Sequence, residues 1–128
     1  MITQSEVVDI LYLKCLQYGI EVYRKGNLPD GEMSEERIVI LPKTITSETY
    51  WKKCFVEINF CVPNNNDGKA GLIRLAELER IVNKTMKGTG MWDETRYKYK
   101  IDTTGIEEDA DLKCHYVNAR VLFEILNV

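Results

Sequence analysis

The stretch WKKCFVEINFCV, residues 51–62, decides how this chain folds. Its side chains alternate between two faces, and a period of two produces an apolar side only in an extended strand. One face carries Cys54, Val56, Ile58, Phe60 and Val62, and the other carries Lys53, Phe55, Glu57, Asn59 and Cys61. A second run of this kind, residues 112–126, closes the chain and places His115, Val117, Ala119, Val121, Phe123 and Ile125 on one face. The two runs predict a packed sheet.

Two amphipathic helices are expected beside this sheet. Thr3 and Glu6 form a capping box at the start of the first helix, and its apolar residues return at helical spacing until Gly19. The second helix is predicted over residues 70–86, where apolar side chains recur every three or four positions and charged ones take the opposite side. Gly88 is expected to end the second helix.

Shorter apolar runs predict the remaining strands. Residues 20–23 form a brief strand, and residues 37–41 form one that pairs antiparallel with 51–62. Residues 95–101 are typical of an edge strand, because cations and aromatic residues alternate there, and the acidic residues 107–111 are expected to connect it to the last strand. The chain is thus predicted to be a single α+β domain, residues 1–128, with a mostly antiparallel sheet of about five strands and two helices packed on one face.

The composition is that of a globular protein. Of 128 residues, 45% are hydrophobic and 29% are charged, which argues against disorder. The formal net charge of -3 gives no general attraction to a phosphate backbone, so we do not expect nucleic-acid binding. The start of the chain lacks the features of a signal peptide, and no apolar run approaches the roughly 20 residues of a membrane span. We therefore expect a cytoplasmic protein without a membrane partner.

The four cysteines do not predict a metal site. Cys15, Cys54, Cys61 and Cys114 are scattered, none forms a C-x-x-C pair, and His115 is the sole histidine. Buried free thiols are the expected state. Because Cys54 and Cys61 are seven positions apart on one strand, they should point to opposite faces. We assign neither a metal ligand nor a cofactor.

His115 is the one residue that could act as a catalytic imidazole. It would need an orienting carboxylate and a nucleophile, for which Glu57 and Cys54 are the candidates. A structural histidine with one hydrogen bond explains the same sequence more simply, because no motif surrounds it. We therefore predict no catalytic residue and no enzyme activity.

Residues 95–101 have a second interpretation. Arg96, Lys98 and Lys100 interleave with Tyr97 and Tyr99, a composition found on surfaces that bind single-stranded nucleic acid. In a strand, however, the cations and the aromatic residues fall on opposite faces, as in a solvated strand over a core. We favour the solvated strand.

The segment 26–36 gathers turn formers and charges and is expected to be an exposed loop, a candidate mobile arm. Loops and strand edges are the surfaces on which proteins meet partners. The candidate interaction surface therefore comprises Asn27, Leu28, Asp30 and Glu32 of the loop, with Arg96, Lys98 and Lys100 of the predicted edge strand.

The element order resembles that of the tail terminator, or tail completion, proteins of long-tailed bacteriophages and prophages. The amphipathic first helix, the strand FVEINF (residues 55–60) with its following loop, the helix over residues 72–86 and the closing strand HYVNARV (residues 115–121) carry the resemblance. It implies a structural protein that assembles into a ring, typically a hexamer, caps the tail tube and docks to the neck. It also implies that the protein moves from the host cytoplasm into the virion. It assigns no individual functional residue.

Two other functional classes remain open. A small enzyme or ligand-binding domain would use a cleft between the second helix and the sheet, where His115, Glu57 or Asn59 would converge. A nucleic-acid-binding accessory protein would need the Arg96–Lys100 cations to be continuous in space with Lys52, Lys53 or Arg120.

Overall fold

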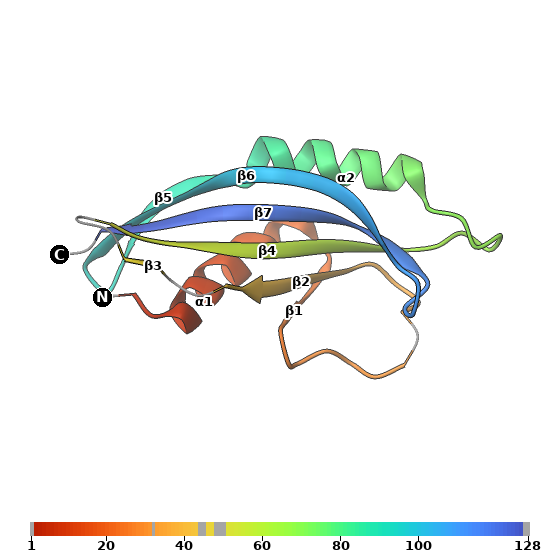
Figure 1. Ribbon diagram of the computed structural model, residues 1–128, viewed down its shortest axis with the longest axis horizontal. Coiled ribbons are helices and arrows are strands. Elements are labelled where there is room, and N and C mark those ends of the chain that lie inside the picture. The colour runs from red at the N-terminus through yellow and green to blue at the C-terminus, as the bar shows by residue number, and fades with distance from the viewer. Residues whose placement is uncertain (1, 32, 44–45, 48–50, 127–128) are drawn as a thin grey trace.

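The computed structural model describes residues 2–31, 33–43, 46–47 and 51–126 (Figure 1). Its helical elements are α1 (Gln4–Cys15), the short 3₁₀ helix η1 (Leu16–Tyr18) and α2 (Leu72–Thr85). Its strands are β1 (Glu21–Arg24), β2 (Arg37–Pro42), β3 (Thr46–Ser47), β4 (Trp51–Pro63), β5 (Gly88–Trp92), β6 (Thr95–Asp109) and β7 (Cys114–Leu126). No described helix is long and apolar enough to cross a bilayer.

The strands form one mixed sheet. Within the described residues the order is β1-β2-β4-β7-β6-β5, and the short β3 pairs with β4. The α+β class is confirmed, and so is the antiparallel pairing of β2 with β4. The expectation of about five mostly antiparallel strands is wrong, because six strands follow one another across the sheet and β1 pairs parallel to β2. A long return through residues 25–36 makes the parallel pairing possible.

The first helix begins as predicted. Thr3 Oγ1 accepts a hydrogen bond from the backbone N–H of Glu6 at 3.2 Å, and Glu6 Oε1 accepts one from the backbone N–H of Thr3 at 3.1 Å. These two bonds satisfy amide groups that an uncapped helix leaves unpaired. Gly19 ends the helical segment with a φ of 68°, a left-handed conformation that costs glycine little.

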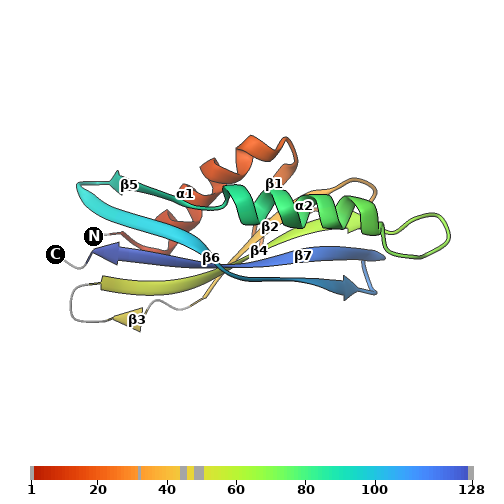
Figure 2. The same cartoon turned by 90° about the horizontal axis from the view of Figure 1, so that it is seen from above.

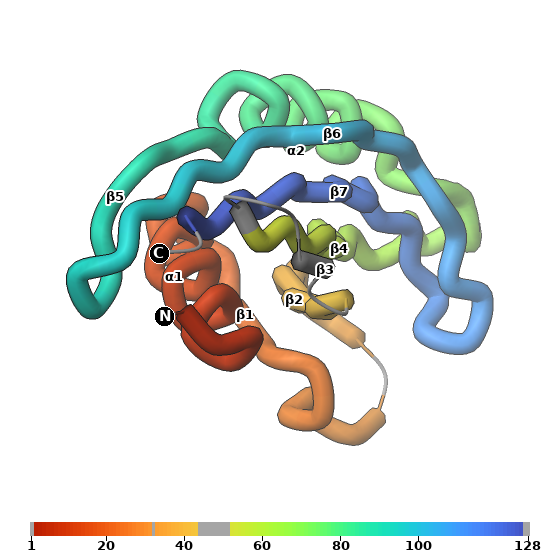
Figure 3. The backbone as a smooth tube through the Cα atoms, turned by 60° about the vertical axis from the view of Figure 1, so that its left-hand side comes forward, coloured from red at the N-terminus to blue at the C-terminus, as the bar shows by residue number. Residues whose placement is uncertain are grey.

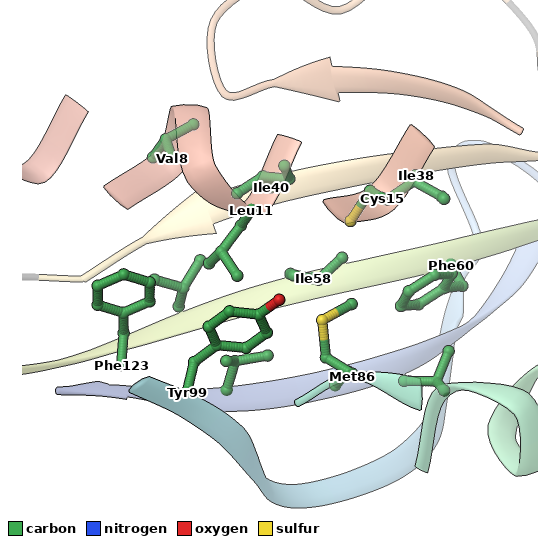
Figure 4. Packing of buried hydrophobic residues seen from close by; sticks show 14 of the residues in the cluster. Val8, Leu11, Cys15, Ile38, Ile40, Ile58, Phe60, Met86, Tyr99 and Phe123 are labelled. Carbon is green, nitrogen blue, oxygen red and sulfur yellow. The ribbon is translucent and has the colours of Figure 1, made fainter. Parts of the chain in front are cut away.

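Both helices cover the same face of the sheet (Figure 2). The apolar face of the 51–62 stretch packs beneath them, with Val56, Ile58 and Phe60 fully buried. Figure 4 shows side chains of α1, β2, β4 and β6 pointing into this shared core. The buried residues of the two helices are Val7, Val8, Ile10, Leu11 and Cys15 of α1 and Leu75, Leu78 and Val82 of α2.

The predicted edge strand is an interior strand of the sheet. β6 runs to Asp109 and lies between β5 and β7, so the acidic residues 107–109 are strand rather than connection. Ile106 is the one large apolar residue of 102–109 and is itself 41% exposed, and a register irregularity between Ile101 and Thr103 interrupts the alternation. Pairing with β7, such as Glu107 opposite Tyr116, keeps this part of the chain extended.

The sheet is strongly curved, and β5 with the start of β6 arches around α1 (Figure 3). On the inner side of this arch Tyr97, Tyr99 and Phe123 stack with interplanar angles of 17° or less. Gly88 lies opposite Tyr99 and Gly90 opposite Tyr97 in the β5–β6 register. Since the glycines carry no side chain, the tyrosine rings occupy the space in front of them.

Candidate interaction surface

Within the part of the chain that the structure describes, no helix covers the second face of the sheet (Figure 2). Phe55, Glu57 and Asn59 of β4 and Tyr116, Asn118 and Leu122 of β7 are half-buried there, and Arg120 is exposed. Arg, Tyr and Phe beside paired polar groups are typical of surfaces that contact other proteins. We call these seven residues the helix-free face.

Side chains of the helix-free face hold one another in place. The Asn118 side-chain amide donates to Asn59 Oδ1 at 2.8 Å, and the Arg120 guanidinium lies 3.9 Å from the centroid of the Phe55 ring. Arg120 also approaches Asp102 at 3.8 Å. This surface is therefore ordered before any partner binds, which lowers the entropy cost of docking.

One end of the helix-free face is covered by the loop between β1 and β2. Met33 of this loop is 6% exposed and packs with Val39, Cys61 and Cys114 in a small second core. Cys54 belongs to the main core, so the prediction that Cys54 and Cys61 face opposite sides is confirmed. Burial raises the pKa of Cys15 to about 12 and that of Cys54 to about 11.

A second anchor ties the same loop to α2. The Arg74 guanidinium donates to both carboxylate oxygens of Glu36, through Nε at 2.7 Å and Nη2 at 2.9 Å. Asn27, Leu28 and Asp30, proposed from the sequence, are exposed on the loop, and Glu32 lies outside the described residues. Sequence reasoning missed Met33 and Glu36, whose partners are distant in the chain.

The cations of the predicted surface lie at the other end of the molecule. Arg96, Lys98 and Lys100 are exposed near the β5 end of β6, whereas the loop reaches β2 at the end where β6 stops (Figure 1). The structure therefore does not bring the two groups of candidate residues together. Glu124 stands between Lys98 and Lys53 in the cross-strand register, so the basic surface that nucleic-acid binding would require is interrupted.

The candidate catalytic residues do not converge either. His115 Nδ1 lies 2.7 Å from Asn64 Oδ1, and its Nε2 lies 3.5 Å from Glu108 Oε2. Val62 pairs with His115, whereas Asn59 pairs with Asn118 and Glu57 with Arg120. Side chains of a strand alternate between its two faces, so positions 57 and 59 share one face and position 62 lies on the other. Glu57 and Asn59 therefore belong to the helix-free face, and His115, which pairs with Val62, belongs to the opposite face.

The space between α2 and the sheet is filled by the buried side chains of α2. An open hollow of about 400 Å³ lies instead at the end of the sheet, beside His115. Met33 of the loop, Asn64 after β4 and Glu108 with Leu112 at the β6–β7 turn all line it. The loop and the β6–β7 turn are therefore neighbours in space.

Comparison with known proteins identifies the fold and no family. No protein-family model and no curated protein matches the chain. One solved structure superposes on 100% of this chain and 98% of its own, with a TM-score of 0.53 and 9% sequence identity. At this identity the likeness concerns the fold alone.

Proposed function

We propose that the protein is a phage or prophage virion structural protein, resembling a tail terminator, that works by self-assembly into a ring and by docking to the tail tube and neck. Its expected partners are further copies of the same chain and these virion proteins, and it performs no catalysis. In this proposal the protein is made in the host cytoplasm and becomes part of the virion.

The proposal is based on the two outer strands of the sheet, β5 and β1. Within the described residues, β5 pairs with β6 alone and β1 with β2 alone, so each outer strand leaves one backbone edge unpaired. The two edges differ in length and in side chains, with Met91 60% exposed on β5 and Glu21 exposed on β1. Two different patches on opposite sides of one subunit favour head-to-tail contacts, and such contacts form a ring when the rotation between neighbouring subunits closes.

The helix-free face adds a third surface. Its half-buried aromatic and polar groups suit contact with a different protein, and it is separate from both sheet edges. In a ring built through the edges, this face would stay available for the tail tube or the neck.

Light scattering coupled to size-exclusion chromatography tests the proposal. We expect an oligomer whose mass is a small multiple of 14.8 kDa, and negative-stain images should show closed rings. A second arm adds purified tail-tube protein to capture assembly that depends on the tube. A chain that stays monomeric in both arms would refute the proposal.

The alternative, an enzyme or ligand-binding domain, finds less support. Its candidate groups lie on opposite faces of the sheet, and side chains of α2 occupy the expected cleft. The hollow beside His115 is the place to test it, by a thermal-shift screen of small molecules on the native protein and on His115→Ala.

A further inference from the structure

The longest strand of the sheet is divided by charge. β6 begins with Arg96, Lys98 and Lys100 and carries its carboxylates, Asp102, Glu107, Glu108 and Asp109, in its second part. All three cations are exposed, and so are Glu107 and Glu108. Asp102 approaches Arg120 at 3.8 Å, Asp109 accepts a hydrogen bond from the backbone N–H of Leu112, and Glu108 lies 3.5 Å from His115 Nε2.

The acidic end extends beyond β6. Exposed Asp111 follows in the β6–β7 turn, and exposed Glu35 comes two residues after Met33, the loop residue that lines the hollow beside this turn. Lys113 is the nearby cation of the turn. We call Glu107, Glu108 and Asp111 with the loop carboxylate of Glu35 the acidic end.

We call Arg96, Lys98 and Lys100, with exposed Lys87 just before β5, the basic end. Carboxylates lie close to these cations, but the net charge of this end is positive. Asp93 and Glu94 of the β5–β6 turn and Glu124 opposite Lys98 reduce the positive charge without balancing it. Exposed Met91 lies opposite Arg96 and offers an apolar contact beside the cations.

The two ends cannot neutralise one another within one molecule. From Arg96 to Glu107 a strand extends roughly 35 Å, which is several times the Debye length of about 8 Å at physiological ionic strength. Figure 1 shows the two ends at opposite extremes of the sheet. Only another molecule can bring such charges into contact, and every copy of this chain carries both signs.

We infer that the head-to-tail contact of the ring places the basic end of one copy against the acidic end of the next. This inference rests on the proposed function, and it adds the two charged ends to the unpaired edges of β5 and β1 as surfaces that join its subunits. The occupant of each end is a second copy of this chain, because one subunit supplies both complementary patches. The contact should therefore weaken as ionic strength rises from about 0.05 M to about 0.5 M.

Charge reversal of each end separately tests the inference. The first variant is Arg96→Glu with Lys100→Glu, and the second is Glu107→Lys with Asp111→Lys. Each should self-associate roughly tenfold more weakly than the native chain, or worse, because like charges then face each other. An equimolar mixture of the two variants should associate again, since the reversed ends of the two variants complement each other and so do their unmodified ends. Sedimentation velocity measures all three samples, and circular dichroism verifies folding.

The matched control for the first variant is Arg80→Glu with Lys84→Glu, two exposed positions of α2 that make the same change in net charge as that variant. It should assemble like the native chain. If all variants form native rings, the charged ends are not the contact, and the ring proposal stands without them. If each variant dissociates and the mixture fails to recover, the pairing of the two ends is refuted. If the native chain forms no assembly, alone or with tail-tube protein, both proposals fail.

Discussion

The indole nitrogen of Trp92 donates a hydrogen bond of 2.5 Å to Oε2 of Glu6, which joins the last residue of β5 to the first turn of α1. The other oxygen of Glu6 accepts from the backbone N–H of Thr3. Both bonds favour the ionised carboxylate. The backbone bond from Thr3, followed by the bond from Trp92, lowers the pKa of Glu6 below its usual value of 4.5.

Glu6→Gln should make stability less sensitive to acid. A carboxyl group whose pKa is depressed in the folded state stabilises the fold above its unfolded pKa, and this stabilisation disappears as pH falls through the folded pKa. The native chain should therefore exceed the variant in urea midpoint at pH 7 and lose that advantage as pH falls below 4.5 through the lowered pKa of Glu6. Glu35→Gln, on an exposed loop position, controls for the loss of one charge. A difference that stays constant with pH would contradict the assignment.

Gly88→Ala should destabilise the protein by about 1–3 kcal/mol through overpacking. A Cβ at Gly88 would lie 2.7 Å from Oη of Tyr99, a buried residue whose ring stacks on Phe123. Gly105→Ala is the control, because its Cβ would meet open space in β6. Gly105→Ala should leave stability unchanged or raise it by up to about 1 kcal/mol. Chemical denaturation measures both, and equal effects would show that the tyrosine contact is unimportant.

The Arg74–Glu36 pair should show a coupling energy of about 1 kcal/mol in a double-mutant cycle with alanine at each position. The bond is bidentate, and the side chains are only 36% and 28% exposed. Arg74 also meets Glu77, whose side chain is 56% exposed, and this second cycle is the control. Its coupling should be about 0.3 kcal/mol. Equal couplings would mean that the loop is not anchored at Glu36.

Met33→Ala should expose the thiols of the second core. Met33 covers Cys61 and Cys114, so its truncation should accelerate alkylation at neutral pH by several-fold or more, chiefly at Cys114, because the hydrogen bond between the two thiols lowers the pKa of Cys114 and raises that of Cys61. Cys15 and Cys54 should remain unmodified in both proteins, because burial raises their pKa values to about 12 and about 11. Leu28→Ala, on the same loop but 43% exposed, should change nothing. Peptide mass spectrometry assigns the sites, and uniform labelling of all four thiols would indicate global unfolding instead.

Local patterns predicted the parts of the fold whose side chains repeat regularly. The alternation in residues 51–62 and the capping box at Thr3 and Glu6 both appear in the structure as expected. β5 escaped prediction because Gly88-Thr89-Gly90 has no apolar alternation, so these glycines indicated only the end of a helix. The second half of β6 escaped because its residues are mostly polar and show no apolar alternation.

The candidate surface was predicted in pieces. The composition of the loop predicted that Asn27, Leu28 and Asp30 are exposed, and the strand period predicted the same for the cations of β6. Neither pattern predicted that the two groups lie far apart. The helix-free face was visible only as the less apolar side of the 51–62 stretch. Its pairs, such as Asn59 with Asn118, join positions 59 residues apart, and no local pattern encodes such contacts.

The sequence by itself determined which side chains enter the main core, because burial of a strand or helix face follows a period set by local backbone geometry. Tertiary structure decided the strand order, the parallel pairing of β1 with β2 and the arch of β5 over α1. Backbone hydrogen bonds between strands are the same for any sequence, so partner and direction depend on how the whole chain closes around its core.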